Sequence, residues 1–385
     1  MMNNSWAIYR YELKKIFRTR LTIIVLIAMF VLTLALNAAE FIAGSKLVTD
    51  ADSVLTGRML DDTMFDEMRG AIDAEMATGE NGETIVTNAS VRDGTYSSLW
   101  KYMKIISGND SRAYQMTRST LEKTFRDVID EALTNQRLTA SERAYWEARR
   151  AKETIPPVYG REGGWGNSLI NLYMENFLIV ITIGATLSGV FASEYTLRTD
   201  AMVFSFRNGK RRLSAIKFLA GITVGFAEAV FLIGEGTLIQ FLIYGVVDAD
   251  TSVQFYYGPL LMDMPAKKAL ILSIGLLLLI SVFYSAFTMC LSQLFRNTTI
   301  PMAAMALLML LSMLTPPDRF RILAQIASYM PATFPGGWTF TDYRLISLLG
   351  AQFNILQIMP VLYGLLILLL GGLTRVSYGR YQVTK

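Results

Sequence analysis

The chain has 385 residues, of which 52% are apolar and 18% are charged, with a formal charge of +4 and a mean hydropathy of +0.35. Soluble chains carry about a quarter charged residues, so this composition argues against a soluble domain, a disordered chain or a nucleic-acid-binding protein. The sequence has no His and one Cys, Cys290, inside an apolar run. It therefore excludes an intrachain disulfide and offers no histidine general base and no His/Cys zinc site.

Residues 1–20 combine apolar and basic side chains at helical spacing. Basic residues flank an apolar stripe formed by Trp6, Tyr9, Leu13, Ile16 and Phe17. Such a stripe predicts an amphipathic helix that lies in the membrane interface ahead of the first span. We expect the apolar run that follows to remain as an anchor, because the preceding segment is long for the basic region of a signal peptide.

Six apolar segments predict an all-α polytopic membrane protein with six transmembrane helices. A spanning helix needs about 20 apolar residues at a rise of 1.5 Å each. The third segment is over-long, so we expect it to tilt, break or protrude, and the last two segments are short. The segments cover residues 21–43, 169–193, 213–247, 268–294, 299–315 and 357–374.

The Lys and Arg residues of the short loops predict the orientation of these spans. Placing both termini in the cytoplasm leaves 14 basic residues on the cytoplasmic side, against 5 in the short outer loops 248–268 and 316–356. Because Lys and Arg are enriched in cytoplasmic loops, we expect a multi-pass protein of a bacterial plasma membrane with both ends inside.

Residues 44–168 are then expected to form an extracytoplasmic domain, with 16 basic and 20 acidic residues. Thr139 and Glu142 have the spacing of a capping box at the start of a helix. A mobile stalk is the alternative, but helical periodicity favours a folded, mainly helical domain. The periodic stripes are Leu60, Met64, Met68, Ile72 and Met76, and then Leu121, Phe125, Val128, Ala132 and Leu133.

Small residues four positions apart predict close packing between helices. Gly221 and Gly225 have this spacing in the third span, and Gly184 and Ser188 have it in the second. Such pairs permit two helix backbones to approach. They more often serve packing within a bundle than a dimer contact.

The sequence has no G-x-x-x-x-G-K-[ST] loop, which P-loop ATPases use to hold nucleotide phosphates. Gly209-Lys210-Arg211 comes nearest, but it lacks the first glycine and the hydroxyl residue. We therefore expect no ATP hydrolysis, no cofactor and no covalent chemistry in this chain. If it takes part in ATP-driven transport, another chain must supply the energy.

The most informative stretch is FASEYTLRTDAMVFSFRNGKRRLSAIKFLAG at 191–221. A span ends, an acidic residue and an amphipathic element follow, and a basic cluster leads into the next span. This order resembles the permease subunits of type-2 ABC exporters, which export drugs, peptides and polysaccharides. Tyr195 stands where that family has Gly, and Asn208 where it has Pro. The matching positions are Ser193, Glu194, Thr196, Leu197, Arg198, Arg211, Arg212 and Lys217.

The resemblance implies that 194–212 is a cytoplasmic coupling segment within 169–385, the region of the last five spans. The opening RYELKKIFRTR resembles the interfacial elbow helix of the family, and 316–356 lies where the family has external re-entrant helices. An ordinary basic loop is the alternative for 194–212, but the apolar residues among its charges favour coupling to an ATPase. The expected coupling residues are Glu194, Arg198, Met202, Phe204, Phe206 and Arg211.

Two carboxyl residues, Glu228 and Glu235, lie inside the third span. Their spacing of seven places them on one face of a helix, about two turns apart. An acidic residue at mid-membrane usually faces the bundle interior or a water-filled cavity. The two residues are therefore candidates for a translocation pathway. The alternatives are hydrogen bonding to a neighbouring helix or, for Glu235, a position near the membrane rim.

The sequence thus predicts the membrane subunit of an ABC exporter for an amphipathic or lipophilic compound, such as a peptide antibiotic or a drug. The resemblance implies two partners: an ATPase subunit that binds ATP and Mg, and a second permease that is either identical or similar. Two rival functions stay open. One is a sodium or cation exporter that uses Glu228 and Glu235, and the other is an antibiotic sensor with little transport.

Overall fold

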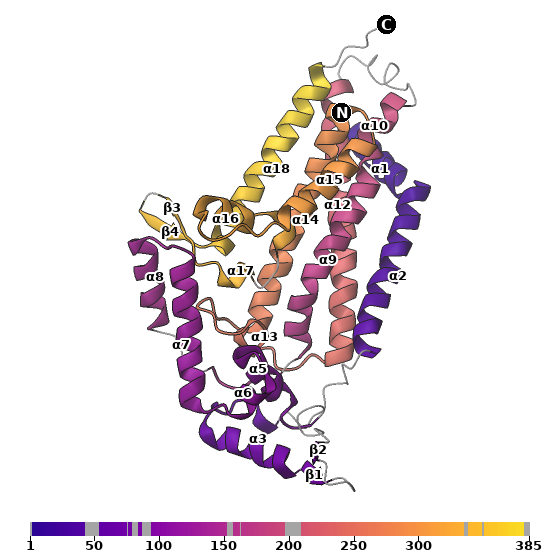
Figure 1. Cartoon of the computed structure of the whole chain (residues 1–385). Helices are drawn as coiled ribbons and strands as arrows, with labels where there is room; N and C mark the ends of the chain where they lie inside the picture. Colours follow the sequence, from indigo (N-terminus) through magenta and orange to yellow (C-terminus); the bar gives the residue numbers. More distant parts are fainter. Residues whose placement is uncertain are drawn as a thin grey trace.

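The computed structural model describes residues 2–42, 54–74, 76–78, 84–86, 94–151, 157–161, 163–196, 209–334, 338–348 and 350–380. The chain forms an elongated helical bundle in which α1 and the end of α18 lie at one end, the terminal end (Figure 1). The bundle helices are α1 (Met2–Phe17), α2 (Arg20–Ile42), α9 (Gly164–Leu187), α10 (Gly189–Thr196), α12 (Gly209–Tyr244), α14 (Ala266–Phe295), α15 (Thr299–Ser312) and α18 (Ile355–Arg380).

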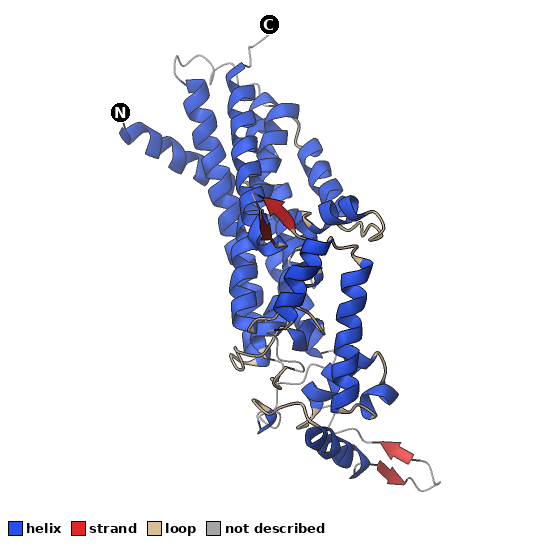
Figure 2. Cartoon of the chain, turned by 90° about the vertical axis from the view of Figure 1, so that its left-hand side faces the viewer, coloured by secondary structure: helices blue, strands red, loops and turns tan. Residues whose placement is uncertain are grey.

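The segment between α2 and α9 packs at the opposite, distal end of the bundle (Figures 1 and 2). Its elements are α3 (Asp62–Ala74), β1 (Met76–Thr78), β2 (Thr84–Val86), α5 (Ser97–Ser107), α6 (Asp110–Tyr114), α7 (Arg118–Asn135) and α8 (Ala140–Arg150). Later parts of the chain add α13 (Gln254–Tyr257), α16 (Arg321–Ser328), the 3-10 turn η2 (Pro331–Thr333), α17 (Trp338–Thr341), β3 (Ile346–Leu348) and β4 (Ala351–Phe353). Each strand pair is an antiparallel hairpin.

Within the described residues, five helices are long and apolar enough to cross a membrane, which confirms a multi-pass, mainly helical protein. They lie in α2, in α9 with α10, and in α12, α14 and α18. The fifth predicted span, 299–315, is not among these five helices. α15 has 14 residues, and at 1.5 Å per residue it extends only about 21 Å, too short to cross ~30 Å of hydrocarbon. The count of six spans therefore stays a prediction.

Two other helices have informative lengths. α12 runs unbroken for 36 residues, about 54 Å, and ends at Gly245, whose φ of 75° is left-handed. The over-long third span therefore does not break, which leaves tilting or protruding as the predicted alternatives. The prediction of a short last span was wrong, because α18 has 26 residues. It continues to Tyr378, which is fully buried with its ring centroid 5.6 Å from that of Phe191.

α9 is the central helix of the bundle. With α10, its span is 78% buried, against 17% for the spans of α2 and α18. The break between α9 and α10 falls at Ser188, whose carbonyl accepts a hydrogen bond from Ser292 Oγ (2.6 Å). The same hydroxyl accepts a hydrogen bond from the Ala192 amide (3.1 Å). Ser292 of α14 thus satisfies backbone groups at the junction, which stabilises the break.

α12 and α14 approach closely at Gly221 and Gly225, as their spacing predicts. A Cβ at Gly221 would collide with Met289 Sδ, and a Cβ at Gly225 would collide with Ser285 Oγ. Gly184 leaves more room, because its Cβ would lie 3.5 Å from Met305. Both α12 glycines therefore serve packing within the bundle.

The α3, α5 and α7 helices of the distal segment bury apolar side chains that belong to the same hydrophobic cluster as those of the bundle. The buried core side chains include Met64, Phe65, Met68, Leu99, Tyr102, Met103, Leu121 and Phe125. Two positions of the predicted helical stripes were wrong. Met76 lies in β1, beyond the end of α3. Val128 is 38% exposed, and Ile129 occupies the buried position because it follows Phe125 by one helical turn.

Two side chains of α7 and α8 hold the backbone near α17. Gln136 donates a hydrogen bond to the Thr341 carbonyl and accepts one from the Tyr343 amide, both at 2.7 Å. Trp146 Nε1 donates a hydrogen bond to the Tyr343 carbonyl (2.6 Å). The predicted re-entrant segment 316–356 therefore contains short helices, and it packs against the distal segment.

Glu142 of α8 is a second attachment point. Its side chain and the Thr139 backbone and hydroxyl form the predicted capping box, which the structure confirms. Glu142 Oε1 also accepts hydrogen bonds from Arg321 Nη2 and the Leu345 amide, both at 2.7 Å. One buried carboxylate thus both starts α8 and holds α16 beside it.

Candidate functional site

At the terminal end, Lys217 of α12 joins neighbouring helices through buried charged groups. Its Nζ forms an ion pair with Glu194 Oε1 of α10 and lies 3.6 Å from Glu12 Oε1 of α1. Tyr378 of α18 donates a hydrogen bond to Glu194 Oε2 (3.3 Å). All four side chains are less than a tenth exposed. These four residues are the terminal cluster.

α1 is held against α12 at two further points. Tyr9 donates a hydrogen bond to Thr223 Oγ1 (2.8 Å), and Arg212 Nε donates one to Ser5 Oγ (2.8 Å). The N-terminal helix is thus formed, and it leaves the bundle at an angle (Figure 2). Its predicted apolar stripe is only partly covered, because Trp6 is 61% exposed.

Among the predicted coupling residues, Glu194 is the one whose surroundings the described part of the chain shows. Arg198, Met202, Phe204 and Phe206 lie outside the described residues, and Arg211 lies in α12 with its side chain undescribed. The sequence motif contains both Glu194 and Lys217. It gives no sign that Glu12 and Tyr378, which are distant in sequence, complete the same cluster.

Glu228 of α12 lies between α12 and α9. It is 2% exposed, and its Oε2 accepts a hydrogen bond from the Thr186 hydroxyl of α9 (3.0 Å). Its Oε1 is buried and has no hydrogen-bond partner in the described part of the chain. The predicted hydrogen bond to a neighbouring helix therefore exists, but it satisfies only one carboxyl oxygen.

Glu235 precedes Gly236 in α12, and Gly236 lies against Glu175 of α9, a residue the sequence analysis did not select. Glu175 is 2% exposed and accepts a hydrogen bond from Asn171 Nδ2 (2.8 Å). Its side chain lies directly against Gly236, where any Cβ would collide with Glu175 Oε1.

The Glu175–Glu235 pair is short of hydrogen-bond donors. Neither oxygen of Glu235 nor Oε2 of Glu175 has a partner among the described residues. Carboxyls that lack hydrogen-bond donors are costly to ionise in an apolar bundle. The signal that could have revealed the pair is Asn171-x-x-x-Glu175, two polar residues on one face of the second span.

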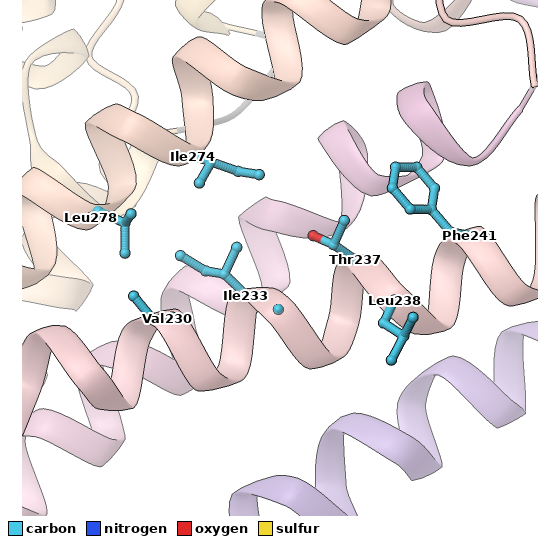
Figure 3. Close-up of a pocket in the computed structure, with 8 residues that line it drawn as sticks. Val230, Ile233, Thr237, Leu238, Phe241, Ile274 and Leu278 are labelled. Atoms are coloured by element: carbon cyan, nitrogen blue, oxygen red, sulfur yellow. The ribbon is translucent and has the colours of Figure 1, made fainter. Parts of the chain in front are cut away.

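Two cavities, one in the bundle and one at its distal end, have no buried carboxyl that lacks a partner among the described residues. Figure 3 shows a cavity of about 380 Å³ between α12 and α14 in which Thr237 is the one polar lining residue. A distal cavity of about 420 Å³ borders α7 and α16. Its charged lining groups already pair, because Arg344 contacts both Asp318 (3.2 Å) and Asp342 (2.8 Å). The described residues hold no group of three His, Cys, Asp or Glu side chains able to bind a metal.

No protein-family model matches the chain, and comparisons with curated proteins and with solved structures give no match. The resemblance to exporter permeases therefore rests on the sequence motifs alone. The site geometry must carry any functional proposal.

Proposed function

We propose that the chain is the membrane-spanning subunit of an ATP-driven ABC exporter that moves an amphipathic or lipophilic compound out of the cell. Three features support this proposal. The fold is multi-pass and helical, both terminal helices reach the same end of the bundle (Figure 1), and the segment that resembles a coupling element begins and ends at that end.

The terminal cluster is the observation that carries the proposal. Glu194 lies in the last turn of α10 and Lys217 in the third turn of α12. Their ion pair therefore joins the two helices between which residues 197–208 run in the sequence. Glu12 and Tyr378 add α1 and α18 to the same junction. A force applied to 197–208 by a partner would thus reach four helices together.

The proposal assigns the chemistry to partners. A separate ATPase subunit would bind ATP and Mg and hydrolyse ATP, because this sequence has no P-loop. A second permease, identical or similar, would complete the pathway within the bilayer. The described part of α9 is buried in the bundle, whereas α2 and α18 keep exposed apolar faces for lipid or for that second permease.

Replacing both Phe204 and Phe206 by Ala tests the coupling assignment. Truncating aromatic anchors at an interface commonly costs more than about 1–2 kcal/mol. The double variant should release the ATPase during purification of the complex, or lose cargo-stimulated ATP hydrolysis, while remaining monodisperse. Phe295→Ala is the matched control, because Phe295 is an exposed phenylalanine near the end of α14. Wild-type ATPase yield with unchanged cargo-stimulated hydrolysis would reject the assignment.

Thiol labelling in a Cys290→Ser background tests the orientation. We expect Ser111→Cys, on the distal α6, to react with an impermeant reagent in intact cells. Arg18→Cys, next to α1, should react only after the cells are opened. The reverse pattern would contradict the proposed direction of export.

The Glu175–Glu235 pair favours a second candidate, a cation-exporting permease. Its carboxyl oxygens lack donors within the described residues, and a monovalent cation would satisfy them. In that case ATP hydrolysis by the assembled complex should depend on sodium. Glu235→Gln should abolish this dependence. ATP hydrolysis that is independent of sodium and stimulated by a lipophilic compound would exclude this candidate.

A further inference from the structure

A cavity lies on the side of α12 that faces α2, next to Glu228. It has a volume of about 550 Å³ and is lined by Phe17 of α1, by Leu26, Ile27 and Phe30 of α2, and by Ala227, Glu228 and Phe231 of α12. This volume lies in the range of small-molecule sites. Glu228 supplies the polar character of an otherwise apolar lining. We call this cavity the Glu228 groove.

Glu228 is a buried acid without a full set of partners. One oxygen accepts the Thr186 hydroxyl, and the other has no hydrogen-bond partner among the described residues. No described Lys or Arg forms an ion pair with it. A buried acid of this kind stays ionised only beside a positive charge and otherwise takes up a proton. An occupant that brings one cationic centre would supply that charge.

The walls of the groove suit the rest of such an occupant. Phe30 and Phe231 pack against each other in its wall with ring centroids 6.0 Å apart, and Phe17 also lines it. Aromatic faces attract cations, and apolar walls bind hydrocarbon. A lipid acyl chain would fill the walls and leave Glu228 unsatisfied. An alkali cation would find too few oxygen ligands, because Glu228 is the one carboxyl lining the groove.

We propose that the Glu228 groove binds a lipophilic organic cation, with its charged centre beside Glu228 and its apolar groups between α2 and α12. Because the span of α2 is mostly exposed, such a compound would reach the groove from the bilayer. That this compound is the cargo rests on the proposed export function. The binding itself does not.

A pair of ions with the same shape and opposite charge tests the proposal. Equilibrium dialysis of the purified, detergent-solubilised chain should show saturable binding of tetraphenylphosphonium and much weaker binding of tetraphenylborate. Glu228→Gln should weaken tetraphenylphosphonium binding by about tenfold or more, because it removes a desolvated charge partner. Glu228→Asp should retain part of the affinity. Glu147→Gln, the same change at an exposed position of α8, should leave the affinity unchanged.

Ala227→Trp provides a second test that keeps the carboxyl. It should fill the groove and abolish binding even if Glu228→Gln is poorly folded. Equal affinity for the two ions in the wild type, or unchanged tetraphenylphosphonium affinity in Glu228→Gln or Ala227→Trp, would overturn the proposal. If the wild type binds the cation selectively but an assembled ATPase complex does not export it, the proposed function is rejected and the groove is kept. If the complex exports the cation but the groove variants bind it as the wild type does, the groove is rejected and the proposed function is kept.

Discussion

Glu194 and Glu228 are both almost fully buried, at 6% and 2% exposed, but their surroundings differ. Glu194 has Lys217 on one oxygen and Tyr378 on the other. Glu228 has a single hydroxyl, and the Glu175–Glu235 pair deeper in the bundle has one amide for two carboxyls among the described residues. The terminal end therefore pairs its buried charge, whereas the middle of the bundle leaves it unpaired.

This difference separates a structural role from a binding role. Removing one partner of a buried ion pair is strongly destabilising, so a paired cluster makes a rigid joint. An unpaired buried carboxyl gives no such benefit to the folded chain alone. Its presence is explained when a ligand supplies the missing charge.

Lys217→Met should produce the largest loss of stability. It would remove the cation that Glu12 and Glu194 share inside the cluster, at a cost of about 3–5 kcal/mol. Cys290 is buried and is the single cysteine of the chain, so reaction of its thiol with a fluorogenic maleimide reports unfolding on heating. Lys267→Met, which removes an exposed ion pair with Asp250, should shift the midpoint little. Equal shifts in the two variants would contradict a rigid terminal cluster.

Glu142→Ala should produce the second largest loss of stability. It removes the acceptor of hydrogen bonds from Arg321 and Leu345 and breaks the capping box of α8, which together are worth about 2–3 kcal/mol. Hydrogen exchange of residues 313–334 should accelerate as α16 separates from α8. Glu147→Ala, at an exposed position of the same helix, serves as the control and should leave exchange unchanged.

The contribution of Glu142 should depend on pH. Burial of the carboxyl opposes its ionisation, but Arg321, the Leu345 amide and Thr139 outweigh burial and lower the pKa of Glu142 from its ordinary value of 4.5. A carboxyl with a lowered folded-state pKa stabilises fully above 4.5 and loses this stabilisation as the pH falls through the folded pKa. The stability difference between wild type and Glu142→Gln should therefore shrink below pH 4.5. A difference that stays constant with pH would mean that the ionised form is not needed.

Glu235→Leu should have the smallest effect, in the opposite direction. Replacing a carboxyl that lacks hydrogen-bond partners by an apolar side chain should raise the free energy of unfolding by about 1 kcal/mol. The same thiol assay can measure it, with Glu12→Leu as the contrasting variant. A marked loss of stability in Glu235→Leu would show that the pair is structural.

Hydropathy predicted most of the bundle, because a helix in lipid must satisfy its backbone and cover itself with apolar groups. It also predicted that the fifth apolar segment is short, as α15 is. It could not predict the length of α18, which passes Arg375 because Tyr378 finds a buried place beside Phe191. That outcome depends on a contact between segments distant in the sequence.

The candidate site was predictable where its residues share one helix. Glu228 and Glu235 stand out because they interrupt an apolar run, and the motif at 191–221 contains Glu194 and Lys217. Glu175 was missed because its partner lies on another helix. Its position depends on α9 crossing α12 at Gly236, which no single-segment pattern shows.

The unbroken α12 has a mechanical consequence. A straight helix of 36 residues behaves as a stiff lever of about 54 Å. A tilt of about 10° around its terminal end would displace its other end by ~9 Å. That far end carries Phe241 and Gly245, which pack against Gly164 at the start of α9. A small angular change beside Lys217 would therefore be amplified into a large displacement beneath the distal domain.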